Sequence, residues 1–184
     1  MIHETAIVAS SATIGKNVSI GPWTIIGEDV QIGDNCDIAS HVVIKGPTVL
    51  GVANKIYQFS TVGDDTPDLK YKGEPTRLVI GDNNTIREGV TIHRGTVQDE
   101  GLTSIGSDNL FMAYSHIAHD CVIKNNCIFS NAASLAGHVR VGNNVSLGGF
   151  TLVHQFCDIG DYAFSGLGTV ISRDVTPYTL VAGN

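Results

Sequence analysis

The sequence lacks a long apolar run and lacks any concentration of basic residues. No window approaches the ~18 apolar residues of a membrane span, and residues 1–13 have neither the cationic start nor the apolar stretch of a signal peptide. Only 11 Lys and Arg are scattered along 184 residues, and the formal net charge is −7. We therefore expect a cytoplasmic protein with no membrane insertion and no nucleic-acid partner, because binding phosphates needs concentrated Lys and Arg.

The sequence also lacks the CxxC spacing of common metal and redox sites, although it contains four cysteines. Its hydrophobic content of 42% and charged content of 16% are typical of ordered proteins with a buried core. We expect one domain over residues 1–184.

What the sequence does contain is a six-residue period of apolar residues. Of 26 positions in this series, 25 are apolar, whereas composition alone predicts about 11. The series changes phase once, and its members are Ile2, Val8, Ile14, Ile20, Ile26, Ile32, Ile38, Ile44, Leu50, Ile56, Val62, Ile80, Ile86 and Ile92, then Ile105, Phe111, Ile117, Ile123, Phe129, Leu135, Val141, Leu147, Val153, Ile159, Ser165 and Ile171.

A period of six fits neither an amphipathic helix nor simple strand alternation, and it indicates a short strand followed by a turn. Glycine follows the apolar residue in 12 of the 26 repeats, and we expect it to supply the backbone angles of a tight corner. These glycines include Gly15, Gly21, Gly27, Gly33, Gly142 and Gly160. Turn-forming Asn or Asp often follows two residues later, as at Asn17, Asn35, Asn83, Asp108 and Asn144.

All four cysteines lie two residues before a large apolar position, where strand alternation points a small residue to the same interior. We therefore expect them to be buried small hydrophobes rather than metal ligands or redox groups. They are Cys36, Cys121, Cys127 and Cys157.

The whole pattern resembles the hexapeptide-repeat left-handed parallel β-helix, a triangular prism whose coil has three hexads, or 18 residues. The left hand is taken from this resemblance, because the usual crossover rule favours the right hand. About nine coils would make a prism on the order of 40 Å tall. Two segments interrupt the repeat, at about residues 63–79 and 94–104, and loops that leave a solenoid often carry binding residues.

In an 18-residue coil, residues 18 apart stack in a column, which brings several histidines to one patch. His119 shares a column with Gly137 and Gln155, and the neighbouring columns contain His138 and His154. His116 lies one strand step earlier, whereas His3, His41 and His93 fall outside the patch, with His93 dependent on the phase shift. Clustered imidazoles suit general acid–base chemistry or metal binding.

Five motifs carry a closer resemblance, to the UDP-N-acetylglucosamine O-acyltransferases of lipid A synthesis. They are DLKYKGEPTR (68–77), TIHRGTV (91–97), SHIAHDC (115–121), LAGHV (135–139) and VHQFC (153–157). The resemblance implies transfer of an (R)-3-hydroxyacyl chain from acyl carrier protein to the 3-hydroxyl of the sugar nucleotide. It also implies a homotrimer with sites between subunits, no metal, and no cofactor besides the phosphopantetheine of the carrier protein.

The same resemblance implies a role for each motif residue. His119 would be the general base, Asp120 would orient it, and the N–H of Gly137 would stabilise the oxyanion. His116, His138, His154 and Gln155 would position the substrates. Asp68 and Lys70 would reach them from the neighbouring subunit, although Asp68 beside a proline also suits a turn.

Two departures from the family accompany the resemblance. Members continue into a helical cap beyond the prism, which this sequence, ending at Asn184, lacks, so we expect an uncapped last coil. Leu167 falls in one column with Asn131 and Gly149, where the family places the residue that limits acyl length. We expect Leu167 to shorten the accepted chain.

Three alternatives remain at this point. A metal enzyme of the γ-carbonic anhydrase type shares the prism and could use His116 and His119 among three zinc ligands. An ice-binding prism would need a regular outward array, whereas the outward positions are irregular. The related N-acyltransferases usually carry an extra N-terminal domain, whereas this sequence enters its repeats at Ile2.

Overall fold

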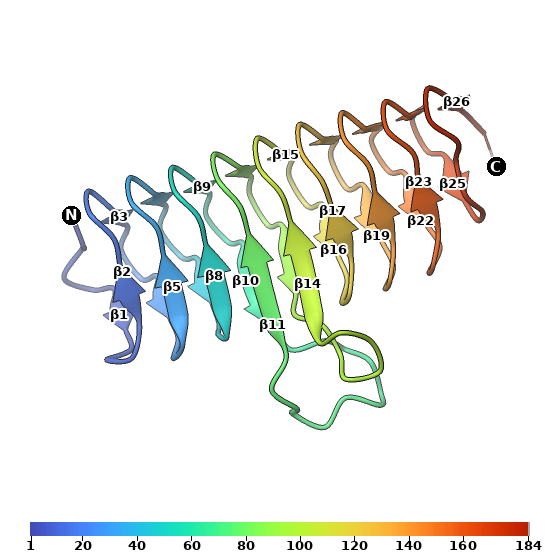
Figure 1. The fold of residues 1–184 in the computed structure, drawn as a ribbon. Coiled ribbons are helices and arrows are strands. Elements are labelled where there is room, and N and C mark those ends of the chain that lie inside the picture. The colour runs from blue at the N-terminus through green and yellow to red at the C-terminus, as the bar shows by residue number, and fades with distance from the viewer. Residues whose placement is uncertain (184) are drawn as a thin grey trace.

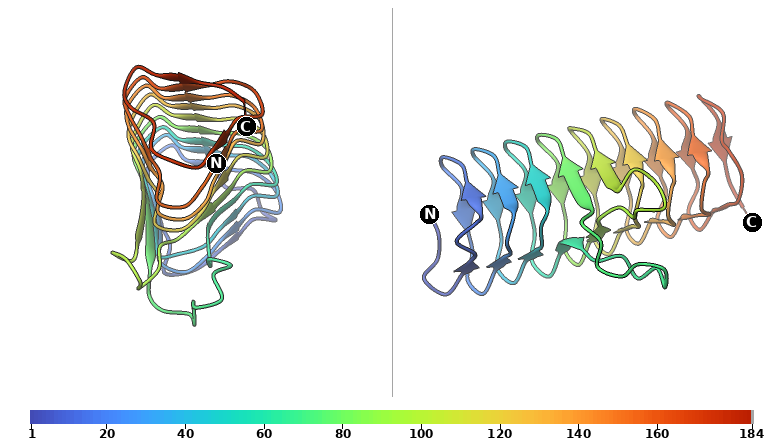
Figure 2. Two further views of the ribbon diagram at one scale, coloured as in Figure 1. Left: turned by 90° about the vertical axis from the view of Figure 1, so that its right-hand side faces the viewer. Right: turned by 60° about the horizontal axis from the view of Figure 1, so that its bottom comes forward.

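The computed structural model describes residues 1–183, which form 26 short parallel β-strands and no α-helix. The chain winds as a stack of triangular coils with its first and last coils at opposite ends (Figure 1). Viewed along the stack, three flat faces enclose the interior (Figure 2). No helix in this part of the chain has the length and apolarity needed to span a membrane.

Each face of the prism is one parallel sheet. Sheet 1 contains β1 (Ile7–Val8), β4 (Ile25–Ile26), β7 (Val43–Ile44), β10 (Thr61–Asp64), β13 (Thr91–His93), β16 (His116–Ile117), β19 (Ser134–Leu135), β22 (Leu152–Val153) and β25 (Val170–Ile171). Sheet 2 contains β2 (Thr13–Ile14), β5 (Val30–Ile32), β8 (Thr48–Leu50), β11 (Arg77–Ile80), β14 (Leu102–Ile105), β17 (Val122–Ile123), β20 (Arg140–Val141) and β23 (Asp158–Ile159). Sheet 3 contains β3 (Ser19–Ile20), β6 (Asp37–Ile38), β9 (Lys55–Ile56), β12 (Thr85–Ile86), β15 (Leu110–Phe111), β18 (Ile128–Phe129), β21 (Ser146–Leu147), β24 (Phe164–Ser165) and β26 (Leu180–Val181).

The strands pair at the predicted 18-residue step, as between Ile7 and Ile25. Two steps are longer, because Thr61 pairs with Thr91 and Thr85 pairs with Leu110, which makes steps of 30 and 25 residues. The extra residues form two loops that leave the same corner, between sheets 1 and 2 (Figure 1). They span residues 65–76 and 94–101, and are shorter than predicted because β11 and β14 extend into the expected loop regions.

The predicted apolar series lines the interior. Its members between Ile20 and Ile171 are buried, and each buried aliphatic side chain contributes about 1.5–3 kcal/mol. Ile2 is 48% exposed, because the first coil has a neighbour on one side only. The four cysteines are buried and unpaired, as predicted.

Except for Gly63, which has a φ of 77°, the glycines after the apolar positions have a different role from the one predicted. Gly15, Gly21 and Gly33 do not adopt positive φ; a Cβ on any of them would lie within 3.0 Å of the backbone of the next coil. Close stacking of the coils, and not turn geometry, therefore requires glycine there. The left-handed corner position falls two residues later, where the predicted Asn17, Asn35, Asn83, Asp108 and Asn144 have φ between 55° and 61°.

A ladder of side chains completes the corner between sheets 2 and 3. In each of six turns, the backbone N–H of the second turn residue donates to a side-chain oxygen of the next coil, as Lys16 does to Asp34. The acceptors are Asp34, Asp82, Ser107, Asn125, Asn143 and Asp161. Backbone donors left free by the turn are thus satisfied coil by coil.

Candidate active site

Three successive coils place the predicted residues at the corner between sheets 1 and 2. The turn after β16 contains His119 and Asp120, the turn after β19 contains Gly137 and His138, and the turn after β22 contains Gln155. Both inserted loops leave this corner from the two preceding coils. The fold therefore brings the loops and the three turns to one place.

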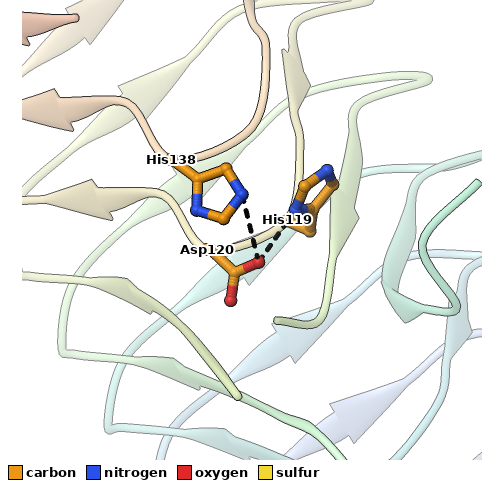
Figure 3. A group of neighbouring side chains, drawn as sticks. All are labelled: His119, Asp120 and His138. Atoms are coloured by element: carbon orange, nitrogen blue, oxygen red, sulfur yellow. Dashed lines mark hydrogen bonds and ion pairs between the residues drawn. The ribbon is translucent and has the colours of Figure 1, made fainter. Parts of the chain in front are cut away.

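His119 and Asp120 form a buried pair. The Nδ1 atom of His119 lies 2.8 Å from Oδ2 of Asp120, and the two side chains are 10% and 1% exposed (Figure 3). Burial raises the pKa of Asp120, but hydrogen bonds from His119 and Thr96 outweigh it and keep the pKa below its ordinary value. An ionised carboxylate only accepts hydrogen bonds, so Nδ1 of His119 carries a proton, and in the neutral form of the ring Nε2 has the free lone pair.

Gly137 lies directly against the His119 imidazole. A Cβ on Gly137 would lie 2.5 Å from Cε1 and 2.7 Å from Nε2 of His119, so no other residue fits there without moving the ring. Within residues 1–183, the N–H of Gly137 donates to no protein acceptor, unlike the equivalent N–H groups of the laddered corner. A free N–H thus lies beside a histidine that can accept a proton.

His138 connects the pair to the second inserted loop. Its Nδ1 atom lies 2.9 Å from Oδ2 of Asp99. Its Nε2 atom lies 3.9 Å from Oδ2 of Asp120 (Figure 3). Its ring stacks on that of Phe156 with centroids 4.5 Å apart and meets the His119 ring edge-on at 5.0 Å. Contacts on three sides therefore fix the His138 ring.

A hollow lies in front of these groups, which we call the site hollow. It is lined by Asp68, Lys70, His119, Gly137, His138 and Gln155, among others. The 65–76 loop brings Asp68 and Lys70 to the same hollow as His119 of this chain, and their reach to a neighbouring subunit stays a prediction. The carboxylate of Asp68 also accepts the N–H of Lys70 at 2.9 Å, the turn contact considered as its simpler role.

His116 does not line the site hollow, and it lies beside a histidine that the spacing excluded. The Nδ1 atom of His116 lies 2.7 Å from Oγ1 of Thr91, and its ring meets that of His93 edge-on at 5.1 Å. Placing His93 outside the patch was wrong, because the 25-residue step at the second loop brings β13 beside β16. Burial lowers the pKa of both residues, that of His93 to about 4.

The two remaining predicted residues lie farther from the pair. His154 is exposed, and its Nδ1 atom lies 3.2 Å from the carbonyl oxygen of Gln155. Leu167 lies at the corner between sheets 3 and 1, with its Cδ1 atom 3.2 Å from where a Cβ on Gly149 would be. The predicted stacking of Leu167 on Gly149 is confirmed, and sheet 1 separates it from His119.

One group of side chains in residues 1–183 has the spacing to hold a metal ion. Potential ligand atoms of His119, Asp120 and His138 lie within 4.8 Å of one another, and His116 is not among them. Both oxygens of Asp120 already accept hydrogen bonds, from the N–H and hydroxyl of Thr96 and from His119. This donor set favours a hydrogen-bonded acid–base pair over the three free ligands of a zinc site.

Comparison with known proteins places the chain among the hexapeptide acyltransferases. Residues 11–46 and 102–137 match the bacterial transferase hexapeptide (six repeats) family. The chain is 62% identical, over all its 184 residues and 71% of the relative, to the acyl-[acyl-carrier-protein]–UDP-N-acetylglucosamine O-acyltransferase of Stutzerimonas stutzeri.

Solved structures agree with this match over the whole chain. LpxA of Acinetobacter baumannii is 48% identical with a TM-score of 0.95, and the chain covers 71% of it. The UDP-N-acetylglucosamine acyltransferase of Francisella novicida is 43% identical with a TM-score of 0.97, and the chain covers 67% of it. The predicted left-handed parallel β-helix is therefore confirmed, and the chain belongs to the acyl-[acyl-carrier-protein]–UDP-N-acetylglucosamine O-acyltransferase family.

Proposed function

We propose that this chain transfers an (R)-3-hydroxyacyl group from acyl carrier protein to the 3-hydroxyl of UDP-N-acetylglucosamine, the first step of lipid A synthesis. The names of relatives at 58–62% identity support both substrates. The observation that carries the proposal is the free N–H of Gly137 beside Nε2 of His119, because thioester attack by a hydroxyl needs both a base and an oxyanion donor.

The reaction starts with Nε2 of His119 taking the proton of the sugar 3-hydroxyl. The sugar oxygen attacks the thioester carbonyl carbon, and the N–H of Gly137 donates to the resulting oxyanion. Collapse of this intermediate forms the ester and breaks the C–S bond. His119 returns its proton to the leaving sulfur, so the phosphopantetheine leaves as a thiol. Asp120 holds the His119 ring in place and stabilises its charged form while it carries the proton.

Direct attack agrees with the placement of the cysteines. All four are buried inside the prism, and burial raises the pKa of Cys121 to about 12. A thiol with so high a pKa is not a useful nucleophile near neutral pH. No acyl-enzyme is needed, and the proposal requires no metal and no cofactor besides the phosphopantetheine of the carrier protein.

Residues around the site hollow would position the two substrates. Lys70 and Asp68 face the hollow with one charge of each sign, suited to a diphosphate and to sugar or acyl hydroxyl groups. His138 and Gln155 line the same hollow, His116 lies in β16 just before the turn that contains His119, and His154 is the neighbour of Gln155 in sequence. We further propose a cytoplasmic homotrimer with each site completed by an adjacent prism.

The test is transfer of labelled 3-hydroxyacyl from acyl carrier protein to UDP-N-acetylglucosamine. His119→Ala should lower kcat by about 10²–10⁴-fold, the usual contribution of a general base. His41→Ala is the matched control, because His41 is exposed at another corner. Undiminished turnover by His119→Ala would remove the proposed base, and stoichiometric zinc in the active protein would favour the metal-enzyme alternative.

A further inference from the structure

Residues 94–96 begin the second inserted loop, and Thr96 donates two hydrogen bonds to the carboxylate of Asp120. The N–H of Thr96 donates to Oδ1 of Asp120 at 2.8 Å, and its hydroxyl donates to Oδ2 at 2.7 Å. Thr96 is fully buried, and the carboxylate is 1% exposed. With His119 on Oδ2 as well, these donors leave Asp120 one orientation.

Arg94, the first residue of this segment, donates hydrogen bonds to the other inserted loop, residues 65–76, and to its start. Arg94 is buried, and its guanidinium donates to the carbonyl oxygen of Gly63 at 2.5 Å, to the hydroxyl of Tyr71 at 3.1 Å and to the carboxylate of Asp65. The N–H of Tyr71 in turn donates to the carbonyl oxygen of Asp68 at 3.0 Å. Arg94 therefore fixes the loop that carries Asp68 and Lys70.

Gly95 lets both contacts form from adjacent residues. A Cβ on Gly95 would lie 2.5 Å from the carbonyl carbon of Gly101 and 2.8 Å from Oδ1 of Asp120. The close approach of this backbone to Asp120 is what places the Thr96 N–H within hydrogen-bonding distance. The segment is thus pressed between the two loops and the His119–Asp120 pair.

We propose that Arg94 and Thr96 are positioning residues that set the His119–Asp120 pair and the Asp68–Lys70 loop in register across the site hollow. The inference rests on the proposed function. Neither residue lines the site hollow, so each acts through the residue that it holds. The two halves predict different defects, because Thr96 holds the reacting pair and Arg94 holds a substrate-binding loop.

Thr96→Val keeps the shape and removes the hydroxyl donor. We expect kcat to fall about tenfold, as for a lost hydrogen bond to a charged group, with KM unchanged. With one donor to Asp120 lost, this carboxylate stabilises the protonated form of its partner His119 more strongly, which moves the acid limb of the kcat/KM profile to higher pH. Thr96→Ser should restore most of the rate. Thr151→Val, another buried threonine whose hydroxyl is hydrogen-bonded, is the control and should leave the profile unchanged.

Arg94→Lys keeps the charge and loses the planar fork. We expect KM for UDP-N-acetylglucosamine to rise about tenfold with kcat little changed, because a lysine cannot reach three acceptors at once. Hydrogen exchange of residues 65–76 should accelerate. Tyr71→Phe should do the same more weakly, which keeps the test valid if Arg94→Lys folds poorly. Arg87→Lys is the control, because Arg87 is a partly exposed arginine that pairs with Glu88.

Two readouts do not depend on turnover. These are loop exchange in Arg94→Lys and the NMR signal of the Nδ1 proton of His119 in Thr96→Val. If both change while the unmutated chain transfers no acyl group, the proposed function fails and the positioning role stands. If the unmutated chain is active but neither variant alters exchange, the NMR signal or the kinetics, the positioning role is wrong.

Discussion

At the residue scale, His93 is half-buried beside His116, and its buried Nδ1 atom has no hydrogen-bond partner in residues 1–183. Its pKa is lowered to about 4 by burial first and by His116 second, against 6.5 in an unfolded chain. Between these values the unfolded state binds the extra proton. The free energy of unfolding should therefore decrease as pH falls from about 6.5 to about 4, and His116 adds to this decrease in the same direction.

The measurement is urea unfolding at pH 7 and pH 5 for the unmutated chain and His93→Asn. A smaller difference between the two pH values in His93→Asn is expected, whatever constant loss the substitution causes. His41→Asn, at an exposed position, should keep the full difference. Equal pH dependence in all three proteins would contradict the role given to burial of His93.

Residues whose environment follows from the repeat could be predicted from sequence. Cys121 is buried because it lies two residues before a large apolar position of the repeat. Asn17 adopts the left-handed backbone conformation because of its position in the six-residue repeat. His93 and Thr96 could not be placed, because they lie at or after the end of β13, where the loop breaks the count. The strand pairing Thr91 to His116 was the missing information.

At the scale of the strand and its turn, alanine substitutions at two glycines should have different effects, one on activity and the other on stability. Alanine at Gly137 would push on the His119 ring, which costs activity, and a 1 Å displacement of a catalytic group can lower kcat about 10²-fold. Alanine at Gly21 would lie 2.7 Å from the backbone nitrogen of Ser40, so the coils themselves must separate.

We therefore expect Gly137→Ala to be inactive with a Tm close to that of the unmutated chain. Gly21→Ala should lower Tm while keeping activity per folded molecule. Thermal melts and acyl-transfer rates on the same samples measure both. A stable and fully active Gly137→Ala would show that the ring moves away without harm, against the geometry described.

The elements themselves were predictable because an apolar residue recurs every six residues through nearly all of the strands. The contacts between coils were not predictable, because only the coordinates show that the glycines allow the coils to approach closely. The laddered corner illustrates the same limit: the side-chain oxygens of Asp34 and Asn143 accept N–H groups from the preceding coil, a role that the six-residue period did not predict.

At the scale of the whole molecule, Leu167 and His119 lie at two corners joined by sheet 1. An acyl chain held at His119 and laid across this face toward Leu167 would meet an exposed side chain, 79% accessible, over Gly149. Leu167→Gly should shift the preference toward longer acyl chains. An assay across acyl lengths checks this, and an unchanged preference would rule out Leu167 as the limit.

The six-residue period followed from counting residues, the prism and its 18-residue coil came from the resemblance, and together they placed His119 in one column with Gly137. The position of Lys70 could not be predicted, because the loop of 12 residues that carries it does not follow the six-residue period. The path of this loop depends on the contact between Arg94 and Tyr71. Family resemblance supplied roles for Asp68 and Lys70, but their presence beside His119 of the same chain came from the coordinates.

The stacking of one coil on the next also determines how the molecule responds to force. The first and last coils lie at opposite ends, and each coil pairs only with its neighbours (Figure 1). Pulled from the two ends, the chain should lose coils one at a time, each releasing about 60 Å of extended chain. The steps of 30 and 25 residues would release more, so two longer increments in a force trace would mark the coils that bear the loops.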